Sequence, residues 1–278
     1  MQTMVPLYGF GGVPYSAVRK AAPRNLLDNS DFRNPVNQRG NAAQSTNGYW
    51  IDRWRHDSVA YAEIKEGCIG INAAGDSIGG VTQVIADASL YNGKKLTLAV
   101  CAKSNGGFLR LAFPYVGEIQ NVQLSDDWVV YTYTVTFSTN VVNTIGIFAE
   151  AGSAIDVKWA ALYEGEYTAA TCPEYRSKGY GAELAECQRY YCKMQSAEDP
   201  VWLSCGHSSY ASGPVRFPVQ MRIKPTITVI AFRDVTSTDR PYTTVNYTKD
   251  GIGYVTNNAN NFSTDMTYYI LFEASADL

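Results

Sequence analysis

Histidine is nearly absent from this sequence, with two copies among 278 residues. Because histidine is the commonest acid–base group and metal ligand near neutral pH, its scarcity weakens most catalytic and metal-binding interpretations. The six cysteines form no C-x-x-C pair and are too sparse for a disulfide scaffold. We therefore expect reduced thiols packed as small apolar groups, and a Cys68–Cys101 disulfide has no local support.

Charge is also scarce. Charged residues make up 18% of the chain, with a formal net charge of -3, against ~25% in ordinary globular proteins. This balance excludes a chain-wide basic footprint for nucleic acid or anionic lipid. No apolar run approaches the ~18 residues that span a bilayer, and the N-terminus lacks a signal-peptide layout. We expect a soluble protein with no nucleic-acid partner and no membrane insertion, made without a Sec signal.

Catalytic motifs are missing as well. The chain has no G-x-S-x-G, P-loop, H-E-x-x-H or dinucleotide fingerprint. Asp28, Asn29, Asp31 and Asp156 offer calcium ligands, but residues 28–31 fit a plain turn better. We predict a protein that is not an enzyme and holds no cofactor or metal. A polysaccharide depolymerase stays the less favoured alternative, with these glutamates available as a catalytic pair: Glu118, Glu150, Glu164 and Glu166.

Tyrosine is what the sequence has in excess, with 20 Tyr beside 10 Phe and 5 Trp. Tyrosine suits both strands and binding surfaces, because a rigid apolar ring carries a polar tip. The clearest strand covers 128–137, where aromatic and aliphatic side chains alternate with threonines. Similar alternation occurs over 95–103, 108–115 and 154–163, with turn clusters between the runs. Residues 25–166 are therefore predicted to form a jelly-roll β-sandwich.

The C-terminal part is predicted as a second β-domain. Residues 167–194 form a linker and a short helix over 182–194, and residues 195–278 form a small β-sandwich. Lys249-Asp250-Gly251 is a good hairpin signal. The fold class is thus all-β, a jelly roll followed by a short helix and a second small β-sandwich.

An apolar helix stripe and an apolar last strand point to self-association, because a domain of ~80 residues buries little surface alone. We expect a homotrimer, although packing of the helix on its own chain is the simpler alternative. The predicted interface residues are Leu184, Cys187, Tyr191, Met194, Tyr268, Ile270 and Phe272.

Carbohydrate binding needs exposed aromatic rings beside amide and acidic groups. Two regions qualify, although the first also fits a core edge and the second a solvated loop. The first holds Tyr49 and Trp50. The second holds Tyr210, Asp239, Arg240, Tyr242, Asn257, Asn258, Asn260 and Asn261.

Several stretches together resemble one protein family. Residues 25–32 (NLLDNSDF), 37–40 (NQRG) and 49–54 (YWIDRW) resemble the opening of the carbohydrate-binding-module-like domain of tailed-bacteriophage fibre proteins. Residues 180–191 are similar to their linker helix, and residues 217–222 and 272–278 to their C-terminal β-domain. The ordered set is more specific than any single motif.

The resemblance implies a virion appendage protein, typically trimeric, that attaches to a host surface carbohydrate after assembly in the host cytoplasm. A purely structural decoration or joining protein of the head, neck or tail is the alternative. Residues 1–24 are rich in Gly and Pro and too apolar for a solvated tail. We expect this arm to anchor the chain to other virion proteins through Tyr8, Phe10 and Tyr15.

Overall fold

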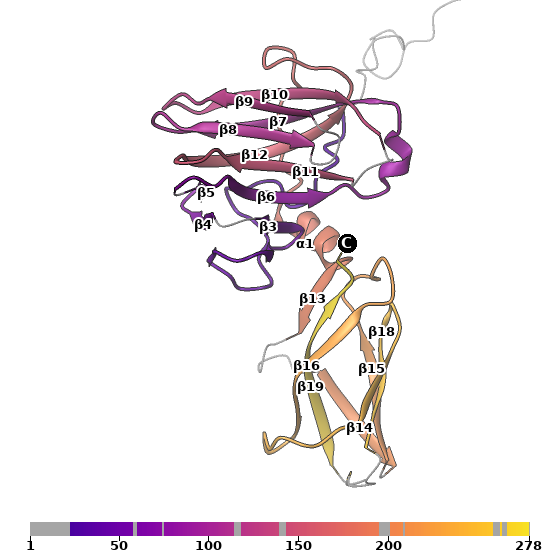
Figure 1. The fold of residues 1–278 in the computed structure, drawn as a ribbon. Helices are drawn as coiled ribbons and strands as arrows, with labels where there is room; N and C mark the ends of the chain where they lie inside the picture. Colours follow the sequence, from indigo (N-terminus) through magenta and orange to yellow (C-terminus); the bar gives the residue numbers. More distant parts are fainter. Residues whose placement is uncertain are drawn as a thin grey trace, which may run out of the picture.

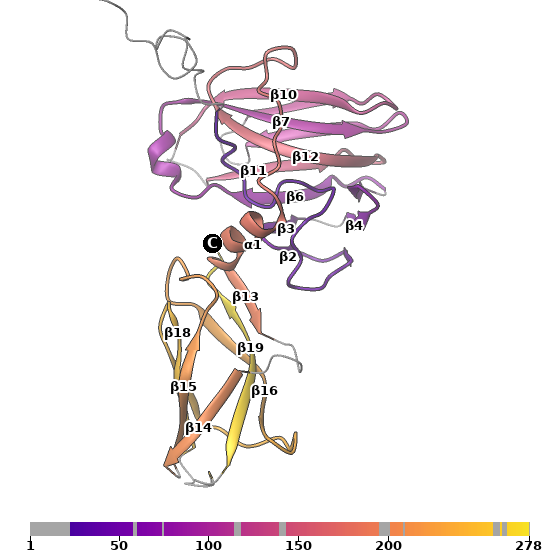
Figure 2. The same cartoon turned by 180° about the vertical axis from the view of Figure 1, so that it is seen from behind.

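The computed structural model describes residues 23–57, 60–73, 75–113, 118–138, 143–194, 201–207, 209–257, 262 and 266–277. They form two lobes that meet at the helix α1 (Tyr180–Gln188) (Figures 1 and 2). Every strand pair is antiparallel, which confirms the all-β class. Tyr8, Phe10 and Tyr15 of the expected anchoring arm lie outside the described residues.

The N-lobe is a sandwich of two six-stranded sheets. The first sheet has the order β1 (Ala43–Gln44), β4 (Tyr61–Lys65), β5 (Cys68–Asn72), β12 (Ala154–Glu164), β7 (Lys95–Lys103), β10 (Val129–Thr136). The second has the order β2 (Gly48–Ile51), β3 (Trp54–Asp57), β6 (Gly79–Val84), β11 (Thr144–Ala149), β8 (Phe108–Phe113), β9 (Glu118–Gln123). A short 3-10 helix, η2 (Ala88–Tyr91), precedes β7. The crossing connections between the sheets are those of a jelly roll.

Period-two alternation builds this core. On β7 the side chains of Leu96, Leu98 and Val100 are fully buried between the sheets. On β10 the side chains of Val135 and Tyr131 face this core, as the alternation with threonine predicts. The strands expected over 95–103, 128–137 and 154–163 are each present within one residue at either end.

The C-lobe is a seven-stranded sheet folded around a second core. The order is β13 (Tyr191–Met194), β19 (Thr267–Ser275), β14 (Val201–His207), β15 (Tyr210–Arg216), β18 (Gly251–Thr256), β17 (Thr244–Tyr247), with β16 (Thr226–Asp234) on the other edge of β19. The predicted hairpin at 249–251 joins β17 to β18, and the Thr248 amide donates to Gly251 O over 2.9 Å.

The predicted helix is shorter than expected. It ends at Gln188, and Tyr191–Met194 form β13, which pairs with the C-terminal half of β19. The sequence of residues 191–194 fits a strand as well as the end of an apolar helical stripe. Pairing with β19 makes it a strand. The expected helical stripe therefore does not exist as one surface.

The predicted trimer interface is wrong for most of its residues, because the chain buries them within itself. Tyr268, Ile270 and Phe272 face the C-lobe core, and the neighbours on the opposite side of β19 are buried too. Cys187 and Tyr191 are also buried, while Leu184 and Met194 are half-buried. The trimer itself stays a prediction without an assigned interface.

Gly251 is held in place by close backbone packing at the start of β18. Its φ is +157°, and an added Cβ would lie 2.0 Å from Val215 O. We expect Gly251→Ala to lower the unfolding free energy by about 2 kcal/mol or more, because the paired backbone of β15 must move. Chemical denaturation measures this loss. Gly253→Ala is the control, since its nearest neighbour would lie at 3.7 Å, and equal stability of the two variants would contradict the account.

Candidate functional site

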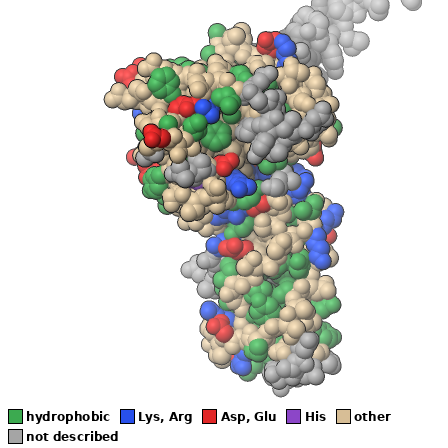
Figure 3. All heavy atoms as spheres, in the orientation of Figure 1, with side chains coloured by type: hydrophobic (Ala, Val, Ile, Leu, Met, Phe, Trp, Pro, Cys, Tyr) green, Lys and Arg blue, Asp and Glu red, His purple; other side chains and the backbone are tan. Residues whose placement is uncertain are grey.

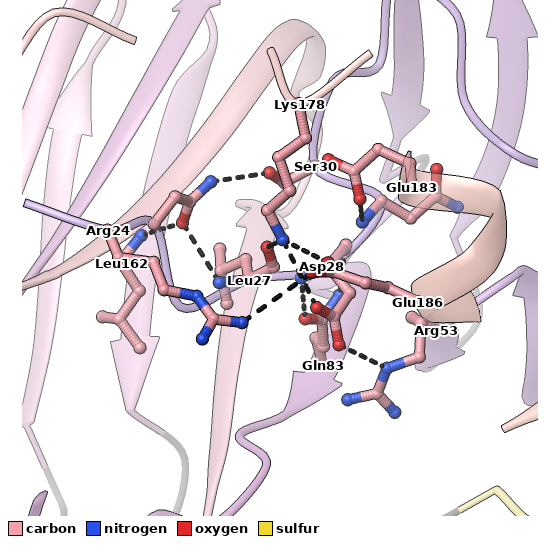
Figure 4. A network of polar contacts seen from close by, with 12 residues as sticks. Arg24, Leu27, Asp28, Ser30, Arg53, Gln83, Leu162, Lys178, Glu183 and Glu186 are labelled. Carbon is pink, nitrogen blue, oxygen red and sulfur yellow. Dashed lines mark hydrogen bonds and ion pairs between the residues drawn. The ribbon is translucent and has the colours of Figure 1, made fainter. Parts of the chain in front are cut away.

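The motifs that carry the family resemblance meet where the two lobes join (Figure 4). Arg53 donates from Nε to Asp28 Oδ2 over 3.1 Å, and its side chain is 1% exposed. The Arg53 guanidinium also lies 3.5 Å from the ring centroid of Tyr190. Lys178 Nζ lies 3.6 Å from Asp28 Oδ1 and pairs with Glu186 of α1. These charges neutralise one another and hold the linker on the N-lobe.

Buried backbone groups complete this contact with α1. The Asn29 amide donates to Glu183 Oε2 over 2.7 Å, and burial raises the pKa of Glu183. Burial alone would raise the pKa of Asp28, but the charges of Arg53 and Lys178 hold it below its ordinary value. The turn at residues 28–31 thus serves the contact between the lobes.

A second cluster ties the loop at residues 37–40 to the C-terminus. The Arg39 guanidinium lies between the rings of Tyr49 and Tyr191, at 4.8 and 3.8 Å from their centroids. Arg39 pairs with Asp277, and its Nε lies 3.9 Å from Asp52 Oδ1. Burial raises the pKa of Asp52 to about 6. We call both clusters together the joint, and charged side chains gather around this boundary between the lobes (Figure 3).

The joint changes the interpretation of the first predicted glycan region. Trp50 is fully buried and its indole N–H donates to Asn41 O over 3.1 Å, so no sugar can stack on it. Tyr49 is covered by Arg39. The prediction for Trp50 is wrong, because its ring packs within the core. Tyr49 is half-buried, and its role as a glycan contact stays a prediction.

The aspartates considered for calcium each face a basic side chain. Asp31 pairs with Arg33 at 2.7 Å and Asp156 with Lys65 at 2.9 Å, while Asp28 pairs with Arg53 as described. Among the residues that the structure describes, no group of three or more His, Cys, Asp or Glu side chains is arranged for a metal ion. The described helices include none long and apolar enough to cross a membrane.

Most of the second predicted region is engaged in contacts of its own loop. Asp239 pairs with Arg233 and Arg240 with Asp234. Tyr242 is 43% exposed and packs edge-on against Phe232 of β16. Asn257 is 4% exposed and its amide donates to Pro241 O, so its prediction as a contact is wrong. Asn258, Asn260 and Asn261 lie outside the described residues.

Tyr210 leads to a different surface. One side of the sheet β14–β15–β18–β17 faces the core, and the other carries a set of outward, uncharged side chains. We call this side the outer face, formed by Trp202, Ser204, Tyr210, Ser212, Thr244, Asn246, Tyr254 and Thr256. Its strands β14, β15 and β18 are labelled in Figure 2. The register aligns Ser204, Ser212, Tyr254 and Asn246 in one row across four strands.

Two exposed tyrosines form the centre of this face. Tyr210 and Tyr254 are 41% and 40% exposed, and their ring centroids lie 6.4 Å apart at an interplanar angle of 65°. With Ser209 and Thr256 they line a hollow of about 450 Å³. Asn246 Nδ2 donates to the Tyr254 hydroxyl over 3.1 Å. The hollow therefore offers apolar ring faces bordered by hydroxyl and amide groups.

Tyr254 is the residue that the sequence prediction missed. Simple alternation puts Ile252 and Tyr254 on the same side of the strand. The register instead shifts between Ser212 and Val215 of β15, so that Ile252 faces the core while Tyr254 faces outward. Gly253 lies at this irregularity, and a glycine inside a strand is a signal for a bulge.

The N-lobe also carries partly exposed aromatic side chains, and Phe148 serves for comparison. Phe148 of β11 lies over two glycines, because an added Cβ on Gly146 or Gly80 would lie 2.1 or 2.8 Å from its ring. Arg110 and Glu150 pair at 2.5 Å beside it. This ring is half-buried, and it provides a matched comparison for the tyrosines of the outer face.

Comparison with known proteins gives fold likenesses only. No family model matches the chain, and no curated protein matches its sequence. A Clostridium thermocellum xylanase 10B structure, with its CBM22-1 and GH10 modules and xylohexaose, is 14% identical with a TM-score of 0.35, covering 52% of this chain and 29% of its own. A CBM4 structure is 20% identical with a TM-score of 0.33, covering 50% of this chain and 99% of its own. A mutant of a family 29 carbohydrate-binding module is 16% identical with a TM-score of 0.31, covering 44% and 82%. The chain thus spans under a third of the length of that xylanase structure.

Proposed function

We propose that the chain is a non-catalytic glycan-binding protein whose binding site is the outer face of the C-lobe. The observation that carries this proposal is the exposed pair Tyr210 and Tyr254 in a hollow bordered by hydroxyl and amide groups. The C–H faces of a sugar ring pack on aromatic rings, and its hydroxyls exchange hydrogen bonds with such polar groups. The described residues that line the tyrosine hollow are uncharged, so this hollow favours a neutral sugar.

A hydrolytic role has less support. Glycosidases need two carboxyl groups that face each other across a cleft. Glu150, Glu164 and Glu166 instead each pair with a lysine or arginine. We therefore place the chain among binding proteins, and release of reducing ends from a bound polysaccharide would contradict this.

The role as a virion appendage rests on the sequence resemblance alone. In that role the arm at residues 1–24 would attach to a particle, and the C-lobe would present its outer face to a host carbohydrate. A purely structural protein of the particle is the alternative. Deletion of residues 1–20 should prevent incorporation into particles while binding of glycan persists, and normal incorporation would refute the anchoring role.

An array of immobilised mono- to hexasaccharides tests the glycan-binding proposal. Wild-type protein should bind at least one series, and Tyr210→Ala and Tyr254→Ala should each weaken that binding by about tenfold or more, as expected for loss of ~1.4 kcal/mol or more at an aromatic contact. Tyr210→Phe should retain most of the affinity, because the ring face remains. Titration calorimetry gives the affinities.

Phe148→Ala is the matched control for these variants, because it removes a ring from a sheet face of the other lobe. Its affinity should equal that of wild type. If Phe148→Ala abolishes binding while the tyrosine variants bind normally, the site lies on the N-lobe and the proposal is wrong. A wild-type protein that binds nothing on the array also refutes it.

A further inference from the structure

The outer face extends beyond the tyrosine hollow into a second hollow of about 430 Å³. It follows the same strands toward the β17–β18 turn. Its lining residues are Gly213, Val215, Arg216, Asn246, Thr248, Asp250, Gly251, Ile252 and Gly253. Asn246 belongs to both parts, because it lines this hollow and donates to the Tyr254 hydroxyl of the first. The two hollows are therefore neighbours along β18.

Glycines line the base of the second hollow, so no side chains fill it there. Gly213 of β15 and Gly253 of β18 lie where the register between the two strands shifts. An added Cβ on Gly213 would lie 2.8 Å from Trp202 O, so packing accounts for that glycine. Gly253 is different, because its Cβ would meet only Asn246 O at 3.7 Å, an ordinary contact, and its φ is not positive. A side chain at 253 would instead fill the hollow.

Polar groups border this floor on both sides. Asn246 and Thr248 of the β17 side face Arg216 of β15 across β18. Asp250 lies at the end of the hollow and accepts a hydrogen bond from Gln220 Nε2 over 2.5 Å. Along β18 the first hollow therefore offers aromatic rings. The second offers a glycine surface bordered by hydrogen-bond donors and acceptors.

We propose that the ligand of the outer face is a linear oligosaccharide that lies along β18, with one sugar on Tyr210 and Tyr254 and the following sugars over Gly253. This inference rests on the proposed function. From Thr256 to Gly251 the strand extends about 17 Å at ~3.4 Å per residue, which exceeds a single sugar ring. A monosaccharide would occupy only one hollow, so each added unit that reaches Asn246, Thr248 or Arg216 contributes further contacts.

Affinity as a function of chain length tests this arrangement. The probes are the monosaccharide through the hexasaccharide of the series that wild type binds on the array. Calorimetry should show the hexasaccharide binding at least tenfold tighter than the monosaccharide. Gly253→Leu should remove this gain while leaving the affinity for the shortest ligand that binds unchanged. Gly181→Leu is the matched control, because Gly181 is exposed on α1, away from both hollows, and an added Cβ there would meet nothing within 4 Å. This variant should keep the gain.

Arg216→Ala provides a second variant if Gly253→Leu does not fold, because Arg216 is exposed and its removal leaves the strands intact. It should weaken the hexasaccharide and spare the monosaccharide. Equal affinity for short and long ligands, or a length gain that survives both variants, would overturn the extended site while leaving the tyrosine site in place. Absence of any glycan binding by wild type would overturn both.

Discussion

The Arg53→Met variant should unfold about 10 °C below the wild-type protein. Arg53 is buried and forms an ion pair with Asp28 through Nε. Its Nη2 donates to Val84 O over 3.0 Å, and its guanidinium lies against the ring of Tyr190. Removing one partner of a buried ion pair costs about 3–5 kcal/mol, since the remaining charge stays buried. For a domain of this size 1 kcal/mol corresponds to about 2–4 °C. Differential scanning calorimetry measures the shift.

Arg55→Met is the matched control for this prediction. Arg55 lies on β3 two residues from Arg53 but is exposed, so its replacement should change the midpoint by no more than about 2 °C. The two variants lose the same charge and gain the same side chain. Similar midpoints for both would show that the joint contributes little to stability.

The Asp52→Asn variant should remove a pH dependence that wild type shows between pH 5 and 7. The folded-state pKa of Asp52 is about 6 against an ordinary value of 3.8, because burial disfavours the ionised carboxylate. A raised folded pKa means that the stability contribution is full below pH 3.8 and is lost as pH rises through about 6. The full loss is about 3 kcal/mol, of which roughly 1–1.5 kcal/mol falls between pH 5 and 7.

Urea unfolding of both proteins at pH 5 and pH 7 tests this. The wild-type unfolding free energy should exceed that of Asp52→Asn by about 1 kcal/mol more at pH 5 than at pH 7. Burial lowers the pKa of His56, so its ionisation changes the stability with the opposite sign. His56 is present in both proteins, so it cancels in the difference. Parallel pH profiles would contradict the burial of an ionisable Asp52 in the joint.

The N-lobe core could be predicted from the sequence because period-two alternation determines which side chains face inward. Leu96, Leu98 and Val100 face the main core as expected. The other side of β7 is buried as well, with Ala99 in a small separate cluster. The end of the helix could not be predicted in this way. Residues 191–194 satisfy both periods, and only pairing with β19, some 80 residues later, makes them a strand.

The candidate site was less predictable for a related reason. Tyr210 was recognised as an exposed ring, but its partner Tyr254 lies 44 residues further along the chain and is brought beside it by the pairing of β15 with β18. Strict alternation places Tyr254 on the same side of the strand as the buried Ile252. The irregularity at Gly253 places the Tyr254 side chain on the outer side instead. Trp50 shows the opposite error, because an aromatic residue in a polar stretch can be a buried core residue.

The outer face can be tested most directly by NMR of protein labelled with 13C on its tyrosine rings. Assignments come from Tyr210→Phe and Tyr254→Phe, and the titrant is the tightest oligosaccharide on the array. We predict that the ring signals of Tyr210 and Tyr254 shift during the titration, while those of Tyr131 and Tyr163 in the N-lobe stay in place. Shifts confined to the N-lobe, or bound ligand with both tyrosine signals unmoved, would contradict the assignment of this face as the glycan site.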